Sequence, residues 1–142
     1  MQKEHKELYL PNTAKIVEII TENSQIKTFG LAFVDQELQQ AFAYEPGQFL
    51  MLSVPHCGEA PISISSSPAQ PGLMHFSIRA AGQLTRVMRK LDPGDTAGLR
   101  RPYGRPFQLT AFVGHTLLFV ATQFGLATPP SVVYSCLPEA RL

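Results

Sequence analysis

The sequence predicts a mainly β fold, an antiparallel barrel or sandwich that a helix interrupts. Short segments with alternating apolar and polar residues follow one another along the chain, and glycines and prolines separate them. One stretch among them has the apolar spacing of an amphipathic helix. With 142 residues, of which 44% are hydrophobic and 16% charged, the chain has the length and composition of one globular domain.

The first two predicted strands, residues 13–21 and 26–34, form a hairpin around a short polar turn. Alternation in the second strand gives it one apolar face, made of Phe29, Leu31 and Phe33. We therefore expect an antiparallel strand with one face in the core.

Three more strands are predicted further along the chain. Residues 48–54 are apolar enough to be covered on both faces, and residues 73–79 alternate again. Between them, residues 62–65 read Ile-Ser-Ile-Ser, which puts apolar side chains on one face and hydroxyls on the other. The hydroxyls are either donors to a ligand or the solvent-exposed face of an ordinary edge strand.

The predicted helix covers residues 83–91 and closes one end of the barrel. Its apolar stripe consists of Leu84, Val87, Met88 and Leu91. The helix begins at a Gly-x-x-Thr sequence, Gly82 to Thr85, whose free amides and hydroxyl are suited to an anion such as a diphosphate. The alternative is that Thr85 only caps its own helix and Gly82 only makes the turn.

Composition argues against several other classes of function. A net charge of +1, without a run of basic residues, argues against a nucleic-acid partner. The charged N-terminus and the short apolar runs predict a cytoplasmic protein without a membrane span. Cys57 and Cys136 lack CxxC spacing, so we expect neither an iron–sulfur cluster nor a metal site in this chain.

Five motifs in order carry a resemblance to a known family. They are EPGQF (45–49), GEAPISISSSP (58–68), IRAAGQLT (78–85), LDPGD (91–95) and GLRRPYGRPF (98–107). Together they resemble the flavin domain of the ferredoxin–NADP reductase superfamily, especially the gamma subunits of hydrogenases and sulfhydrogenases and the electron-transfer subunits of dihydroorotate dehydrogenases. The resemblance implies a six-stranded antiparallel Greek-key barrel with one capping helix that binds FAD, followed by an α/β domain that binds NAD(P)H.

The same resemblance implies nine cofactor-binding residues and no catalytic acid or base. They are Pro61, Ile62 and Ser63 along the isoalloxazine, Ile78, Arg79 and Ala80 on the ribose and adenine side, and Gly82, Leu84 and Thr85 at the diphosphate. Arg79 is also a charge partner for the diphosphate. Phosphate contacts at both Arg79 and Thr85 favour FAD over FMN.

Three departures from the family pattern stand out. Many members carry Arg-x-Tyr-Ser where this chain has residues 60–63, Ala-Pro-Ile-Ser, although the hydrogenase-like branch is similar to this chain there. Arg101 stands where a glycine is usual in the RGPYG stretch. After a predicted strand at residues 117–121, the glycine-rich turn that would hold a nucleotide diphosphate is replaced by Thr-Gln-Phe-Gly, residues 122–125.

We therefore expect an N-terminal tail (1–11), an FAD-binding barrel (12–110) and a short α/β stub (111–142), the truncated start of an NAD(P)-binding domain with a predicted helix at 130–137 and a lost NAD(P)H site. The expected function is an FAD-binding electron-transfer module of an NAD(P)H-linked oxidoreductase. Its expected partners are iron–sulfur or hydrogenase-type redox subunits. The alternatives are a non-catalytic flavin-binding or docking subunit and the degenerate product of an interrupted gene.

Overall fold

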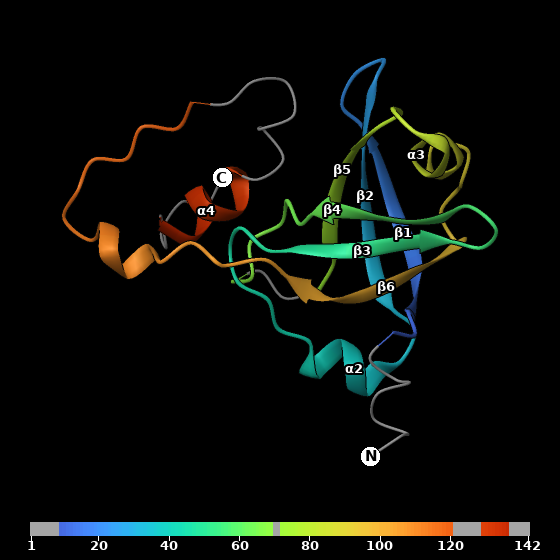
Figure 1. The fold of residues 1–142 in the computed structure, drawn as a ribbon, viewed down its shortest axis with the longest axis horizontal. Coiled ribbons are helices and arrows are strands. Elements are labelled where there is room, and N and C mark those ends of the chain that lie inside the picture. The colour runs from blue at the N-terminus through green and yellow to red at the C-terminus, as the bar shows by residue number, and fades with distance from the viewer. Residues whose placement is uncertain (1–8, 70–71, 121–128, 137–142) are drawn as a thin grey trace.

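The computed structural model describes residues 9–69, 72–120 and 129–136. Six antiparallel strands form one curved sheet in the order β4-β3-β6-β1-β2-β5 (Figure 1). The strands are β1 (Asn12–Thr21), β2 (Ile26–Phe33), β3 (Phe49–Val54), β4 (Gly58–Ser63), β5 (Met74–Arg79) and β6 (Thr96–Tyr103). The predicted six-stranded antiparallel barrel is confirmed.

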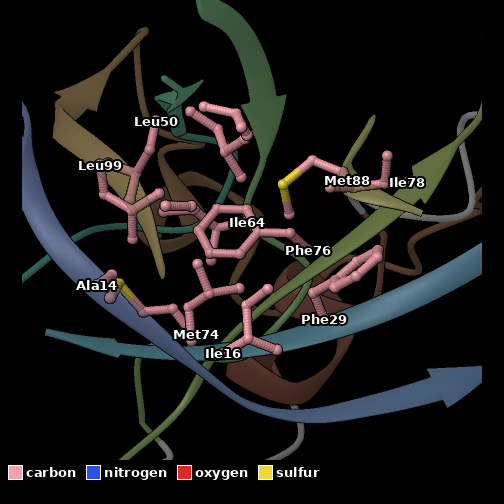
Figure 2. Packing of buried hydrophobic residues seen from close by; sticks show 14 of the residues in the cluster. Ala14, Ile16, Phe29, Leu50, Ile64, Met74, Phe76, Ile78, Met88 and Leu99 are labelled. Atoms are coloured by element: carbon pink, nitrogen blue, oxygen red, sulfur yellow. The ribbon is translucent and has the colours of Figure 1, made fainter. Parts of the chain in front are cut away.

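The hydrophobic core fills the space inside the sheet (Figure 2). The inward-facing residues of the strands form this cluster, whose largest buried side chains include Phe29, Phe76, Ile16, Leu50 and Leu99, while β4 contributes only partly buried side chains. The helix α3 (Gln83–Met88) adds Leu84 and Met88 to this core, as its apolar stripe predicted. Burial of about 1.5–3 kcal/mol per large apolar side chain makes this cluster the main source of stability.

The two edge strands, β4 and β5, meet across a seam that the chain after β4 bridges. The Ser65 amide donates to the His75 carbonyl at 2.8 Å, and the His75 amide donates to Ser66 Oγ at 3.1 Å. Tyr44 Oη lies 2.8 Å from the same Ser66 hydroxyl. Because these serines are buried and hydrogen-bonded, the alternative of a solvent-exposed serine face does not hold for them: β4 ends at Ser63, and the hydroxyls that follow join the seam.

Two further details differ from the sequence predictions. β3 is not covered on both faces, because Leu50, Leu52 and Val54 are buried whereas the alternate residues are partly exposed. A second short helix, α2 (Gln36–Ala41), lies on the opposite side of the barrel from α3 (Figure 1). Its N-cap is Asp35, whose carboxylate accepts from two backbone amides, but it buries no residue and so has no apolar stripe to reveal it.

The chain leaves the barrel after β6 and forms a 3₁₀ turn, η1 (Leu109–Phe112), and a helix, α4 (Pro129–Cys136). α4 agrees with the helix predicted at residues 130–137. Residues 117–120 of the predicted strand have no regular structure, because the described residues offer them no neighbouring strand to pair with. The turn at residues 122–125 lies outside the described residues.

Candidate functional site

The three segments that carry the predicted cofactor residues meet on one side of the barrel. α3 packs against β3, β4 and β5, and β4 lies beside β5 across the seam. The two strands and the helix that carry residues 61–63, 78–80 and 82–85 are therefore neighbours in the fold.

The side chains of the β4 motif do not share one face. Ile62 lies opposite Leu50 in the ladder and packs against the core, whereas Pro61 and Ser63 lie on the other face of the strand. A planar ring that lies against one face of β4 can therefore meet either the Ile62 side chain or those of Pro61 and Ser63. The β4 motif residues on the face away from the ring can contribute only backbone atoms to the contact.

Strand β5 divides its motif residues in the same way. The Ile78 side chain is 2% exposed and belongs to the core, so only its backbone is available to a ligand. Arg79 is half-buried on the opposite face, and Ala80 follows the end of the strand. Arg79 is thus the charged side chain that β5 brings to this region.

The hydroxyl of Thr85 is engaged in the start of its own helix. Its Oγ1 accepts from the amides of Ala81 at 3.0 Å and Gly82 at 2.9 Å, and donates to the Gly82 carbonyl. These bonds fix the loop that enters α3. Leu84, the third motif residue here, is 6% exposed and packs in the core.

Gly82 is a glycine that the fold itself does not require. Its φ of −127° and ψ of −176° are open to any residue, and a Cβ added there would meet no atom within 4 Å. Neither backbone strain nor crowding by protein atoms explains the absence of a side chain at this position. The space in front of the loop is therefore free to receive a ligand.

The charge of this region favours an anion. Residues 60–91 contain no Asp or Glu but four Lys and Arg residues. A groove of about 710 Å³ runs along α3 and is lined by Ala80, Gln83, Arg86, Val87, Arg89 and Lys90. None of the described residues that line this groove is a carboxylate, and the ion pairs found among the described residues involve none of its cations.

Two other motifs form a structural clasp, which we define as the contact between residues 45–49 and 103–107. Phe49 stacks on Tyr103 with ring centroids 5.8 Å apart, and the Phe107 amide donates to the Pro46 carbonyl. Gly47 and Gly104 both have positive φ, and each lies against an aromatic ring of the other segment. The clasp explains both glycines by packing and backbone conformation. The sequence pattern alone did not reveal it, because its two halves are more than fifty residues apart.

Arg101 occupies a backbone position that normally favours glycine. Its φ is +34°, and the β3–β6 register shifts there, since Leu50 pairs with Pro102 and Met51 with Arg100. This is a β-bulge, in which a residue of left-handed conformation is usually glycine. The departure noted in the sequence therefore places an arginine in a strained position.

Next to the bulge, Arg100 is held by two side chains. It donates to Glu59 at 2.6 Å and to Tyr103 Oη at 2.7 Å. The Glu59 hydrogen bond raises the pKa of the Arg100 guanidinium, which stays charged.

The described part of the chain contains no group of three or more His, Cys, Asp or Glu side chains that could hold a metal ion. Across the same residues, no helix has the length and apolar character needed to cross a membrane.

Comparison with known proteins identifies relatives of this barrel. No protein-family model matches the chain. Sulfhydrogenase 1 subunit gamma of Pyrococcus furiosus is 38% identical over 134 residues, which cover 89% of this chain and 46% of the relative. The probable dihydroorotate dehydrogenase B (NAD(+)), electron transfer subunit, of Methanocaldococcus jannaschii is 37% identical over 117 residues, which cover 82% of this chain and 39% of the relative. This chain is a homologue of these subunits.

The solved structures agree with this assignment at the level of the fold. Ferredoxin-NADP+ reductase from Plasmodium falciparum, solved with 2'P-AMP, superimposes with a TM-score of 0.76 and 18% identity, and the match covers 92% of this chain and 55% of that one. The barrel is therefore a ferredoxin-NADP+ reductase-type barrel, as the five motifs predicted. This chain spans less than half the length of each of the two curated relatives named above.

Proposed function

We propose that this chain is the FAD-binding electron-transfer module of an NAD(P)H-linked oxidoreductase. Its homology to gamma and electron-transfer subunits and its reductase-type barrel support the proposal. The observation that carries the cofactor assignment is Gly82, which neither backbone conformation nor packing requires. Such a glycine allows a phosphate to approach the backbone closely.

The residues near Gly82 fit an anionic dinucleotide. We assign the diphosphate to Arg79 and to the loop of Gly82, Leu84 and Thr85, where the cations of residues 60–91 favour negative charge. The isoalloxazine is assigned to β4, where the side chains of Pro61 and Ser63 lie on the face away from the core and Ile62, whose side chain packs against the core, contributes mainly backbone. Ile78 and Ala80 are assigned to the ribose and adenine side, also through backbone atoms.

In this proposal residues 12–110 form the flavin module, residues 1–11 a tail, and residues 111–142 the start of a nucleotide-binding domain. FAD held by these residues would supply two-electron chemistry with NAD(P)H and one-electron chemistry with a redox carrier. We assign that carrier to an iron–sulfur or hydrogenase-type redox subunit, in keeping with the subunit character of the relatives.

The first test is flavin binding by the purified chain. Equilibrium dialysis with FAD and with FMN at micromolar protein is expected to show about one FAD per chain and weaker retention of FMN. No FAD retention would remove the central assignment.

Thr85→Ala tests the diphosphate loop. We expect FAD binding to weaken by about 1–2 kcal/mol, because in the complex the hydroxyl would donate to a phosphate oxygen in place of the Gly82 carbonyl, and Thr85→Ser to bind nearly as well as the wild type. Because Thr85 Oγ1 also holds two loop amides, stability should fall by about 1 kcal/mol in the alanine variant. A loss of stability with unchanged affinity would leave Thr85 as a helix cap only.

The nucleotide site needs a separate test. A turn that cradles a diphosphate needs small residues, and Gln123 and Phe124 are large. We therefore expect the FAD-loaded chain to be reduced slowly by NADH and NADPH in anaerobic stopped-flow measurements. Saturable reduction faster than about 1 s⁻¹, the low end of ordinary turnover numbers, would mean that nucleotide binding survives. Slow reduction favours the alternative of a flavin-binding docking subunit over a complete reductase.

A further inference from the structure

The end of α3 is tied to the β1–β2 turn by one arginine. Arg89 follows the last residue of the helix, and its Nη1 donates to the Ser24 carbonyl at 3.2 Å and to the Gln25 carbonyl at 2.8 Å. Its Nη2 donates to the Ser24 carbonyl as well, at 3.1 Å. Three hydrogen bonds therefore join segments that lie more than sixty residues apart in the sequence.

The turn that receives Arg89 is rigid by its own hydrogen bonds. Asn23 Oδ1 accepts from the amides of Gln25 at 2.8 Å and Ile26 at 2.9 Å, which forms an Asx turn. The Asn23 amide in turn donates to the Ile26 carbonyl. The carbonyls of Ser24 and Gln25 are thus fixed in position before Arg89 reaches them.

A second tie runs in the opposite direction. Lys27, at the start of β2, donates from Nζ to the Arg89 carbonyl at 3.2 Å. A cation at this end of a helix also complements the helix dipole. We call Arg89, its acceptor carbonyls on Ser24 and Gln25, and Lys27 the α3 anchor.

A helix of this length needs such an anchor. α3 has six residues, which is too few for a helix to be stable by itself, and only Leu84 and Met88 of them are buried. The opposite end of the same helix is the loop from Gly82 to Thr85. Any loosening of α3 therefore also displaces this loop.

We propose that Arg89 is a positioning residue for FAD binding: by anchoring α3 to the β1–β2 turn it holds the loop from Gly82 to Thr85 where the diphosphate binds. The inference rests on the proposed function for its ligand, but the anchor itself is a property of the protein without FAD. In this proposal FAD binds only the state in which α3 is docked. Its apparent Kd is therefore inversely proportional to the fraction of the protein in that state.

The competing explanation is that Arg89 acts only through its charge, since it also lines the basic groove. Arg86 provides a matched control, because it lies on the same helix, lines the same groove and is exposed, and none of the hydrogen bonds or ion pairs found for the described residues involves its side chain. Arg86→Ala and Arg89→Ala remove the same charge. Arg89→Lys keeps the charge but lacks the planar fork that reaches two carbonyls.

The experiment measures two quantities for each variant: the Kd for FAD from flavin fluorescence, and hydrogen exchange of the α3 amides in the protein without FAD. For Arg89→Ala we expect a rise in Kd on the order of tenfold and a rise in α3 amide exchange at least as large, because Kd follows the docked fraction whereas exchange follows the open population. Arg89→Lys should recover only part of either loss. Arg86→Ala should leave exchange unchanged and raise Kd by no more than about threefold.

Equal effects of Arg86→Ala and Arg89→Ala on Kd, or full recovery by Arg89→Lys, would overturn the anchor in favour of charge alone. If Arg89→Ala does not fold, Asn23→Ala attacks the same anchor from the turn and leaves the arginine in place, and it should raise α3 exchange too. If the wild-type chain does not bind FAD, the proposed function fails, and the exchange measurements alone decide whether Arg89 anchors α3. Unchanged exchange of the α3 amides in both Arg89→Ala and Asn23→Ala would reject the anchor, whether or not the chain binds FAD.

Discussion

The clasp and the β5–α3 loop both contain motif glycines, but the reasons for these glycines differ. In the clasp, Gly47 has a φ of +91°, and a Cβ there would lie 2.5 Å from the Phe107 ring. In the loop, Gly82 has an extended backbone and open space around its Cα. The fold thus accounts for the first glycine and not for the second.

This difference separates two kinds of motif residue that look alike in the sequence. A glycine that packing and backbone conformation both demand is evidence about architecture. A glycine that neither demands points to something outside the chain, and here it lies where β4, β5 and α3 meet. Substitutions in the two regions should therefore affect different measurements.

Gly47→Ala should give the largest loss of stability. The variant combines a left-handed backbone, unfavourable for any residue with a Cβ, with a clash against Phe107, and we expect it to lower the free energy of unfolding by about 3 kcal/mol. Urea unfolding followed by circular dichroism measures this loss. FAD affinity of the folded fraction should be unchanged, and a large loss of affinity there would place the clasp in the flavin site.

Gly82→Asp should have the opposite profile. Asp is a good N-cap residue, so stability should stay the same or rise slightly, while its carboxylate should repel the diphosphate and weaken FAD binding about 100-fold, or about 2.7 kcal/mol. Gly82→Asn has nearly the same shape without the charge and should lose about tenfold. Calorimetric titration of both variants gives the comparison. Wild-type affinity in both would show that the open space is not used by FAD.

Arg101→Gly should stabilise the barrel. Relief of the positive φ at the bulge is expected to add about 1 kcal/mol to the free energy of unfolding. Arg105→Gly is a control that removes another exposed arginine of the same region, from a position where φ is not positive. A drop in stability for Arg101→Gly would mean that the arginine side chain makes contacts that outweigh its backbone strain.

We expect the smallest effect on stability at Tyr44, where the contribution of the phenol depends on pH. Burial raises the pKa of the Tyr44 phenol, and the hydrogen bond with Ser66 opposes this only in part. Because the folded state favours the neutral phenol, its contribution to stability is complete below the usual pKa of about 10 and is lost as the pH rises through the raised value.

Tyr44→Phe should therefore cost about 0.5–1 kcal/mol near neutral pH, for the lost hydrogen bond, and flatten the decline in stability above pH 10. Unfolding measured for both proteins between pH 8 and 11 tests this, since the other tyrosines cancel in the difference. Parallel curves for the two proteins would contradict the assignment.

The spacing of apolar residues was enough to predict the hairpin, strand β5 and helix α3. In β5 and α3 the buried side chains recur with the period of the local structure, as with Leu84 and Met88. In β2 the apolar residues Phe29 and Leu31 do so as well, although Thr28 and Gly30 on the other face are also buried. α2 escaped prediction because none of its residues is fully buried. Residues 117–120 of the strand expected at 117–121 have no regular structure, because apolar character cannot supply a pairing partner. The sequence left open whether the serine hydroxyls bind a ligand or face solvent, and the seam instead buries Ser65 and Ser66.

The sequence by itself determined the order of the five motifs along the chain, the apolar stripe of α3 and the family that these motifs resemble. These are local properties, set by spacing and residue type. Only the tertiary structure decided that Ser65 and Ser66 are buried at the seam, that Gly47 is held by Phe107 while Gly82 is open, and that Arg89 reaches the β1–β2 turn. Each of these depends on contacts between segments distant in the chain, and no local pattern encodes which distant segment a side chain will meet.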